Sequence, residues 1–172
     1  MSHPMSQTRN PQAGVMLIEA LVGILIFAIG ILALIAMQAT AIRAAQDSRY
    51  RTEAINYAND LLSQIMVSVN RNPANFEASL QSFVHQPTTA KDCEFSGAAS
   101  ATDAVKEWVK LVTNADSVAH PQRMPLPGTS AGMLQVRVDT ALGAYNQVAI
   151  TVCWRAPDDP VARKHVLISY VT

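Results

Sequence analysis

The chain has 172 residues, enough for one ordinary domain and an anchoring segment. Its 13 basic and 13 acidic residues give a formal net charge of zero, and they form no basic stripe, so nucleic acid is not an expected partner. Charged residues make up only 15% of the chain and are scattered along it, which argues against a disordered tail.

The first expected elements are a short polar segment and a long apolar helix. Residues 1–13 carry one arginine, Arg9, and no acid. The sequence Gly14-Val15-Met16-Leu17-Ile18-Glu19 follows and leads directly into 23 uncharged residues, 20–42. A bilayer core needs about 20 helical residues, so this run is predicted to span a membrane. A carboxylate at the mouth of such a span is costly unless a cation neutralises it, which singles out Glu19.

This arrangement resembles the prepilin leader of type IV pilins and of type II secretion pseudopilins. The resemblance implies that a prepilin peptidase cleaves after Gly14 on the cytoplasmic side, that the new amine of Val15 is methylated, and that Glu19 takes part in subunit assembly. An α-amino group has an unperturbed pKa of about 8 and can be cationic, so it could pair with Glu19 of a neighbouring subunit. The family usually has Phe after the cleaved glycine, and Val15 departs from that pattern.

Charge does not orient the apolar segment, because Arg9 precedes it and Arg43, Arg49 and Arg51 follow it. The resemblance implies an inner-membrane protein with its leader in the cytoplasm and its domain in the periplasm, which enters the pilus on assembly. An alternative is secretory cleavage at Ala39-Thr40-Ala41. Against it, the apolar run exceeds the 7–15 residues of a signal-peptide core.

A second half of the same helix is predicted over residues 43–72, since no proline interrupts residues 15–72. Its expected apolar stripe consists of Ile55, Ala58, Leu62, Ile65, Met66 and Val69. Asn70-Arg71-Asn72-Pro73 is expected to end it. Residues 54–72 are similar to the corresponding helix of PilV-like minor pilins.

Residues 73–132 are predicted to be mostly irregular. A short helix is expected over 75–84, and a second over 102–112 with Thr102 or Asp103 as its N-cap. Trp108 is interpreted as a core anchor on the apolar side of that second helix. His120-Pro121 and the segment from Pro125 to Gly128 indicate turns.

The last forty residues, 133–172, are predicted to form antiparallel strands. Apolar residues alternate with polar ones at Leu134, Val136 and Val138, then at Val148, Ile150, Val152 and Trp154, and finally at Val166, Ile168 and Tyr170. Gly143-Ala144 and the segment Pro157–Pro160 supply the turns. We therefore expect an α+β fold with one face of a sheet on the core, and the resemblance implies that the long helix packs across that sheet.

The two cysteines, Cys93 and Cys153, fit no metal-binding or C-x-x-C spacing. If the domain lies outside the cytoplasm, a disulfide between them is the natural expectation. The alternative is two buried free thiols in a reducing compartment.

One enzyme signature is present. Gly128-Thr129-Ser130-Ala131-Gly132 matches G-x-S-x-G, and Asp139, Asp158 or Asp159 and then His165 follow in hydrolase order. That motif requires a strand before the serine and a helix after it, whereas prolines precede this one and a strand-like run follows. A calcium site at Asp158-Asp159 lacks the spacing of a known loop. We expect no enzyme activity, no metal site and no cofactor.

These patterns predict a leader over residues 1–14, a membrane and assembly helix over 15–42 and a periplasmic domain over 43–172. The resemblance implies a minor pilin, a structural subunit that helps to prime the type IV pilus. Its implied partners are other minor and major pilins, the prepilin peptidase, the inner membrane and a tip adhesin. A minor pseudopilin of a type II secretion system is the alternative.

Overall fold

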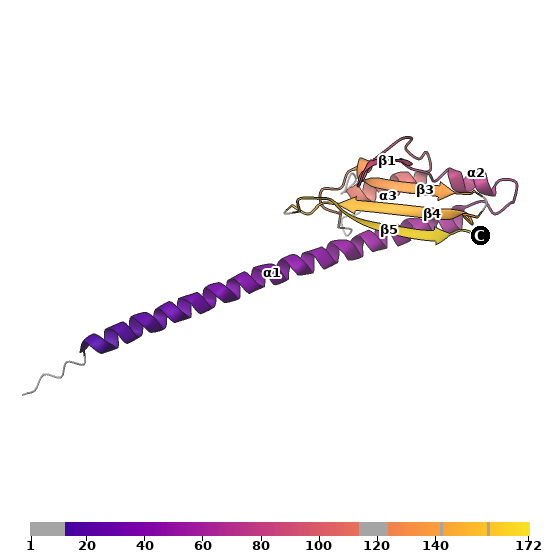
Figure 1. Ribbon diagram of the computed structural model, residues 1–172. Helices are drawn as coiled ribbons and strands as arrows, with labels where there is room; N and C mark the ends of the chain where they lie inside the picture. Colours follow the sequence, from indigo (N-terminus) through magenta and orange to yellow (C-terminus); the bar gives the residue numbers. More distant parts are fainter. Residues whose placement is uncertain (1–12, 114–123, 142, 158) are drawn as a thin grey trace, which may run out of the picture. The chain divides into compact units, whose positions relative to one another are not determined.

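A computed structural model describes residues 13–113, 124–141, 143–157 and 159–172 (Figure 1). The expected leader up to residue 12, the His120-Pro121 turn and Asp158 lie outside the described residues. The chain divides into two compact units, one ending at Ala45 and one running from Gln46 to Thr172. In chain order the elements are α1 (Ala13–Ser68), α2 (Phe76–Gln81), β1 (Thr88–Lys91), β2 (Glu94–Ser96), α3 (Asp103–Thr113), the 3-10 turn η1 (Ala131–Met133), β3 (Leu134–Asp139), β4 (Gln147–Trp154) and β5 (Arg163–Tyr170).

Helix α1 ends at Ser68, four residues before the expected end. The cause is a set of side chains that take over the backbone groups of the next turn. The Asn70 side chain accepts the N–H of Asn72 at 2.9 Å, and the Asn72 side chain accepts the N–H of Ala74 at 3.0 Å. Arg71 turns back and donates to the carbonyl of Met66 at 2.9 Å. Such local bonds compete with the helix, so they stop it before Pro73 does.

The second half of α1 packs on the antiparallel sheets, as predicted, and the fold is α+β. Its buried side chains are Ala54, Tyr57, Ala58, Leu61, Ile65 and Val69. The predicted stripe was therefore slightly out of phase, because Ile55, Leu62 and Met66 are only half-buried. The helix meets the domain through a face centred on Tyr57 and Leu61.

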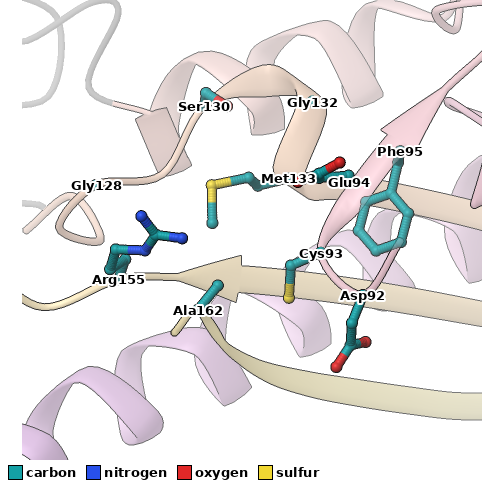
Figure 2. Close-up of a pocket in the computed structure, with 10 residues that line it drawn as sticks. All are labelled: Asp92, Cys93, Glu94, Phe95, Gly128, Ser130, Gly132, Met133, Arg155 and Ala162. Carbon is teal, nitrogen blue, oxygen red and sulfur yellow. The ribbon is translucent and has the colours of Figure 1, made fainter. Parts of the chain in front are cut away.

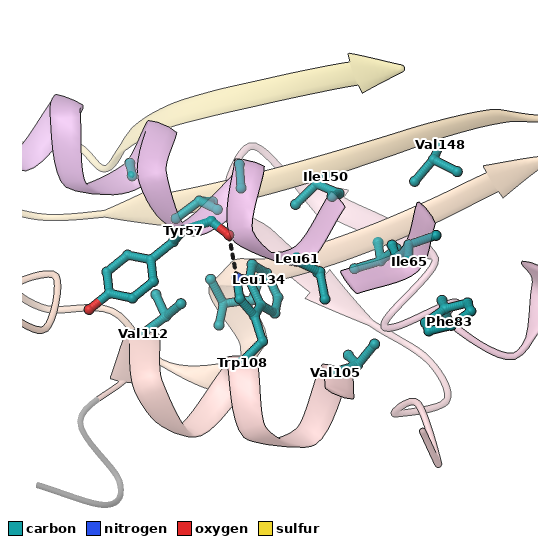
Figure 3. Packing of buried hydrophobic residues seen from close by; sticks show 14 of the residues in the cluster. Tyr57, Leu61, Ile65, Phe83, Val105, Trp108, Val112, Leu134, Val148 and Ile150 are labelled. Atoms are coloured by element: carbon teal, nitrogen blue, oxygen red, sulfur yellow. Dashed lines mark hydrogen bonds between the residues drawn. The ribbon is translucent and has the colours of Figure 1, made fainter. Parts of the chain in front are cut away.

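One core joins α1, α3 and the sheet (Figure 3). Trp108 of α3 is 1% exposed and donates its indole N–H to the carbonyl of Tyr57 at 2.9 Å. The Tyr57 hydroxyl donates in turn to the carbonyl of Met124 at 3.0 Å. The prediction of Trp108 as a core anchor is confirmed, and its polar atom has the partner that a buried indole needs.

The main sheet has three antiparallel strands in the order β3-β4-β5. Val136 lies opposite Ile150, and Ile150 lies opposite Leu167. Val136 and Ile150 are fully buried, which confirms the predicted inward face of β3 and β4.

The final strand has the opposite facing from the one expected. Val166, Ile168 and Tyr170 are each exposed, while Leu167 packs against the core. Val166 lies opposite Thr151 and Ile168 opposite Ala149, so these residues share the sheet face that points away from α1 and α3. Alternation in a strand defines two faces but does not say which face is buried. In β5 the buried face is the one that carries Leu167.

The middle of the chain is more regular than predicted. Helices α2 and α3 are present, and the segment between them forms an antiparallel hairpin, β1–β2, that the sequence did not indicate. Every residue of β1 is exposed, so the hairpin lacks the apolar alternation by which strands are usually found. Thr102 precedes α3, and its carbonyl accepts the first helical bond, from the N–H of Lys106 at 3.1 Å.

Candidate functional site

The start of α1 carries the residues predicted for processing and assembly. In the described residues α1 runs from Ala13, so Gly14 and Val15 are helical and Glu19 lies one turn after Val15. Residues four apart lie on the same face of a helix, which places the Val15 amide and the Glu19 carboxylate on one side. Both side chains are exposed, and Glu19 makes no hydrogen bond or ion pair within the described part of the chain. A lone carboxylate therefore stands at the start of an apolar helix.

The first half of α1 has no protein environment of its own. Every large apolar side chain from Val15 to Ile42 is at least 40% exposed. The 23 uncharged residues would extend about 34 Å at 1.5 Å per residue, close to the thickness of a bilayer core. Among the described residues α1 is the one helix long and apolar enough to cross a membrane. Thr40 donates its hydroxyl to the carbonyl of Ala36 at 3.1 Å, so even this polar group is satisfied within the helix.

The two cysteines are brought together. Cys93 and Cys153 form a disulfide across 60 positions of sequence, with their Cα atoms 5.7 Å apart. Cys93 occupies the turn of the β1–β2 hairpin, and Cys153 lies on β4. Lys164, opposite Cys153 on β5, also reaches Asp92 beside Cys93 at 2.5 Å. The tip of the hairpin is thus fastened to the main sheet by a covalent bond and an ion pair.

An ionic cluster that the sequence did not reveal joins α1 to β5. Arg163 donates to both carboxylate oxygens of Asp159, at 2.7 and 3.0 Å, and also to Asp47. The Arg163 hydrogen bond lowers the pKa of Asp159, and Asp159 raises the pKa of Arg163. Asp159 is only four residues from Arg163, but Asp47 is 116 residues away and gives no local signal, so the tertiary structure is needed to reveal the whole cluster.

The G-x-S-x-G segment lines an open pocket of about 430 Å³ beside the disulfide (Figure 2). The ionisable residues that line it are Asp92, Glu94 and Arg155, and no histidine is among its lining residues. Ser130 is extended and precedes only the three-residue turn η1, after which β3 begins. A nucleophile elbow needs a strand before the serine and a helix after it, so this segment does not form one.

Gly128 has a structural reason to be glycine. Its φ is +60°, and a Cβ atom there would lie 2.7 Å from the carbonyl oxygen of Arg155. The neighbouring Pro127 carbonyl accepts the N–H of Arg155 at 2.9 Å, so the loop is held close to the end of β4. The first glycine of the motif therefore serves a close backbone contact. No group of three or more His, Cys, Asp or Glu side chains within the described ranges is placed to hold a metal ion.

Residues 36–106 match the family model described as Tt1218-like, Type IV pilin Tt1218. The match covers less than half of the chain, from the last residues of the apolar half of α1 to the start of α3, and it does not include residues 14–19. No curated protein and no solved structure matches the chain. The match supports a type IV pilin, a structural subunit that interacts with other pilins in a pilus. The α+β fold and the single N-terminal apolar helix, which fits a single-pass membrane anchor, agree with it.

Proposed function

We propose that this chain is a minor pilin, similar to PilV, made as a precursor with residues 1–14 as its leader. A prepilin peptidase would cleave after Gly14, the amine of Val15 would be methylated, and residues 15–42 would anchor the subunit in the inner membrane. The domain from residue 43 onward would stand in the periplasm until the subunit enters the pilus. There it would meet other minor and major pilins and take part in priming assembly and in displaying a tip adhesin.

The observation that carries this proposal is the exposed Glu19 at the start of a helix half with no buried apolar side chain. Such a helix needs a membrane or the apolar core of a fibre around it, and an unpaired carboxylate there costs several kcal/mol. Cleavage after Gly14 would create a cationic amine at Val15, one helical turn away from Glu19. The carboxylate of one subunit and the amine of its neighbour would then neutralise each other and fix the axial register of the subunits.

The test is the substitution Glu19→Ala in the cells that make this chain. We expect the variant to be made and inserted in the membrane, but to be reduced by at least about tenfold in sheared pilus fractions, because one lost charge pair is worth at least about 1.4 kcal/mol in such an environment. The readout is the ratio of the chain in pili to the chain in membranes, measured by quantitative immunoblotting.

The matched control is Glu77→Ala, which removes an exposed acid from α2 and leaves the start of α1 intact. Its pilus-to-membrane ratio should equal that of the wild type. Equal ratios for Glu19→Ala and the wild type would exclude the assembly role of Glu19. Recovery of the chain with a secretion pseudopilus, and not with pili, would contradict the minor-pilin assignment.

A further inference from the structure

A buried histidine holds the base of the β1–β2 hairpin. His85 is 4% exposed and lies between α2 and β1. Its backbone N–H donates to the carbonyl of Val136 on β3, and its carbonyl accepts the N–H of Val136, both at 3.0 Å. Val136 is a core residue, so the imidazole opposite it lies on the core side of the sheet.

The imidazole ring is a hydrogen-bond acceptor in this structure. Nδ1 of His85 accepts the backbone N–H of Ser100 at 3.2 Å, which places the ring proton on Nε2. Nε2 is buried, and no group in the described residues meets hydrogen-bond geometry with it. The ring is therefore built for the neutral form, since a second proton would sit on Nδ1 and point at the N–H of Ser100.

His85 and Ser100 bracket the hairpin from its two ends. Between them, the N–H of Gln86 donates to the carbonyl of Ala98 at 2.9 Å, which closes the base of the hairpin. The Ser100 hydroxyl donates to the carbonyl of Ser82 at 2.8 Å, so this residue also connects the hairpin to the end of α2. Gln86 has a φ of +47°, a conformation that a residue with a side chain adopts at a cost. The base of the hairpin is thus held closed under strain.

The elements around His85 that the structure describes offer no compensating charge. Burial lowers its pKa below the ordinary 6.5, and the backbone carbonyl of Ala131 opposes this only in part. The charged residues on the adjoining elements are Glu77 on α2, Lys91, Asp92 and Glu94 on the hairpin, Asp103 and Lys106 at the start of α3 and Arg137 and Asp139 on β3, and none contributes to the shift. A buried imidazolium would therefore have no counter-ion in the described part of the chain.

We propose that His85 is an acid-released latch, which holds the base of the β1–β2 hairpin against β3 while it is neutral and frees it when it is protonated. The Cys93–Cys153 disulfide keeps the tip of the hairpin tethered, so the released segment opens at its base and stays attached. The stabilisation is fully present above pH 6.5, the ordinary pKa of the open state, and is lost as the pH falls towards the lower pKa of the closed state. This latch does not depend on the proposed role in a pilus.

Hydrogen exchange measured by mass spectrometry on the full chain in detergent micelles tests the latch. After correction for the intrinsic pH dependence of exchange, amides of residues 86–100 should exchange faster between pH 7.5 and 5, by up to about tenfold per pH unit below 6.5. Amides of β4 should not change. In His85→Asn, which keeps an acceptor but cannot titrate, the acid response of the hairpin should disappear.

His165→Gln is the matched control, because burial and Arg51 lower the pKa of His165 too, but it lies on β5. The hairpin of this variant should respond to acid as the wild type does. An equal acid response in His85→Asn and the wild type, or an unchanged hairpin in the wild type, would overturn the proposal.

If His85→Asn does not fold, an NMR titration of the wild-type imidazole decides instead. The latch requires His85 to titrate below 6.5 together with a shift of the Ser100 amide. Titration at or above 6.5, or no change at Ser100, would refute it.

Discussion

The two halves of helix α1 are both helical, but they differ in charge content and in the burial of their apolar side chains. From Val15 to Ile42 Glu19 is the only charged residue, and each large apolar side chain is exposed. From Gln46 to Ser68 the helix has a polar face with acids and arginines, and Tyr57, Leu61 and Ile65 are fully buried against the sheet and α3. Helix propensity carries the backbone through both halves, but their side chains differ: the uncharged first half fits a membrane anchor, and the amphipathic second half packs on protein.

The largest expected effect concerns the Cys93–Cys153 disulfide, which lies in the unit from Gln46 to Thr172 that the second half of α1 packs into. Replacing both Cys93 and Cys153 by Ser should lower the free energy of unfolding by about 4 kcal/mol, because the disulfide closes a loop of 60 positions in the unfolded chain. Urea unfolding followed by the fluorescence of the buried Trp108 and Trp154 measures it. A reductant should lower the wild-type midpoint and leave the variant unchanged; equal midpoints for both proteins would show that the bond contributes nothing.

A pair of identical substitutions on the same helix sharpens the comparison directly. Leu61 is 0% exposed and Leu25 is 60% exposed. Leu61→Ala should lower the free energy of unfolding by about 3.5 kcal/mol, the cost of lost burial and a core cavity. Leu25→Ala should leave the urea midpoint in micelles unchanged. A similar loss from both substitutions would mean that the apolar half is packed against protein after all.

A complementary experiment introduces a lysine into each half of α1. Leu25→Lys within the apolar run should disfavour membrane insertion by up to about 3 kcal/mol, and a larger fraction of the chain should leave the membrane on carbonate extraction. Gln64→Lys, at an exposed position in the second half, is the control and should extract like the wild type. Leu25→Lys that remains fully membrane-bound would argue against a lipid-facing helix.

The smallest expected effect belongs to the ionic cluster at the start of the second half. Arg163→Met should lower the urea midpoint slightly at low salt and make it less sensitive to salt, because exposed ion pairs are screened. Arg163 lowers the pKa of Asp159 below its ordinary 3.8, so its contribution is present above that value and is lost as the pH falls through the lower pKa. Lys106→Met removes a comparable surface pair on α3 and is the control. A wild-type salt dependence in Arg163→Met would contradict the cluster's role.

The sequence predicted the fold correctly in most places where the spacing of apolar residues matches the side of the element that is buried. The strands β3 and β4 and the anchor Trp108 each follow a periodicity that the structure confirms, and the uncharged run forms part of a helix long and apolar enough to cross a membrane. The facing of β5 was wrong because Val166, Ile168 and Tyr170 alternate as well as core residues do. The hairpin was missed because a disulfide and the hydrogen bonds of Gln135 to Gln86 and Thr89, at 2.9 and 3.2 Å, hold it in place of apolar packing.

The functional residues also fall into those that the sequence predicts and those that only the structure brings together. Gly14, Val15 and Glu19 are predicted from their spacing within one short segment, and their roles stay a prediction. The cluster of Asp47, Asp159 and Arg163 and the latch at His85 depend on contacts between distant segments. Single ionisable residues in a sequence do not tell which partner, if any, they will meet.

The mature N-terminus of the native chain tests the central claim most directly. Intact-mass analysis and N-terminal sequencing of the protein purified from its own membranes should find a chain that begins at Val15 with a methylated amine. In cells without the prepilin peptidase the chain should keep residues 1–14. A native chain that begins at Met1 or at Ile42 in cells with the peptidase would contradict the account.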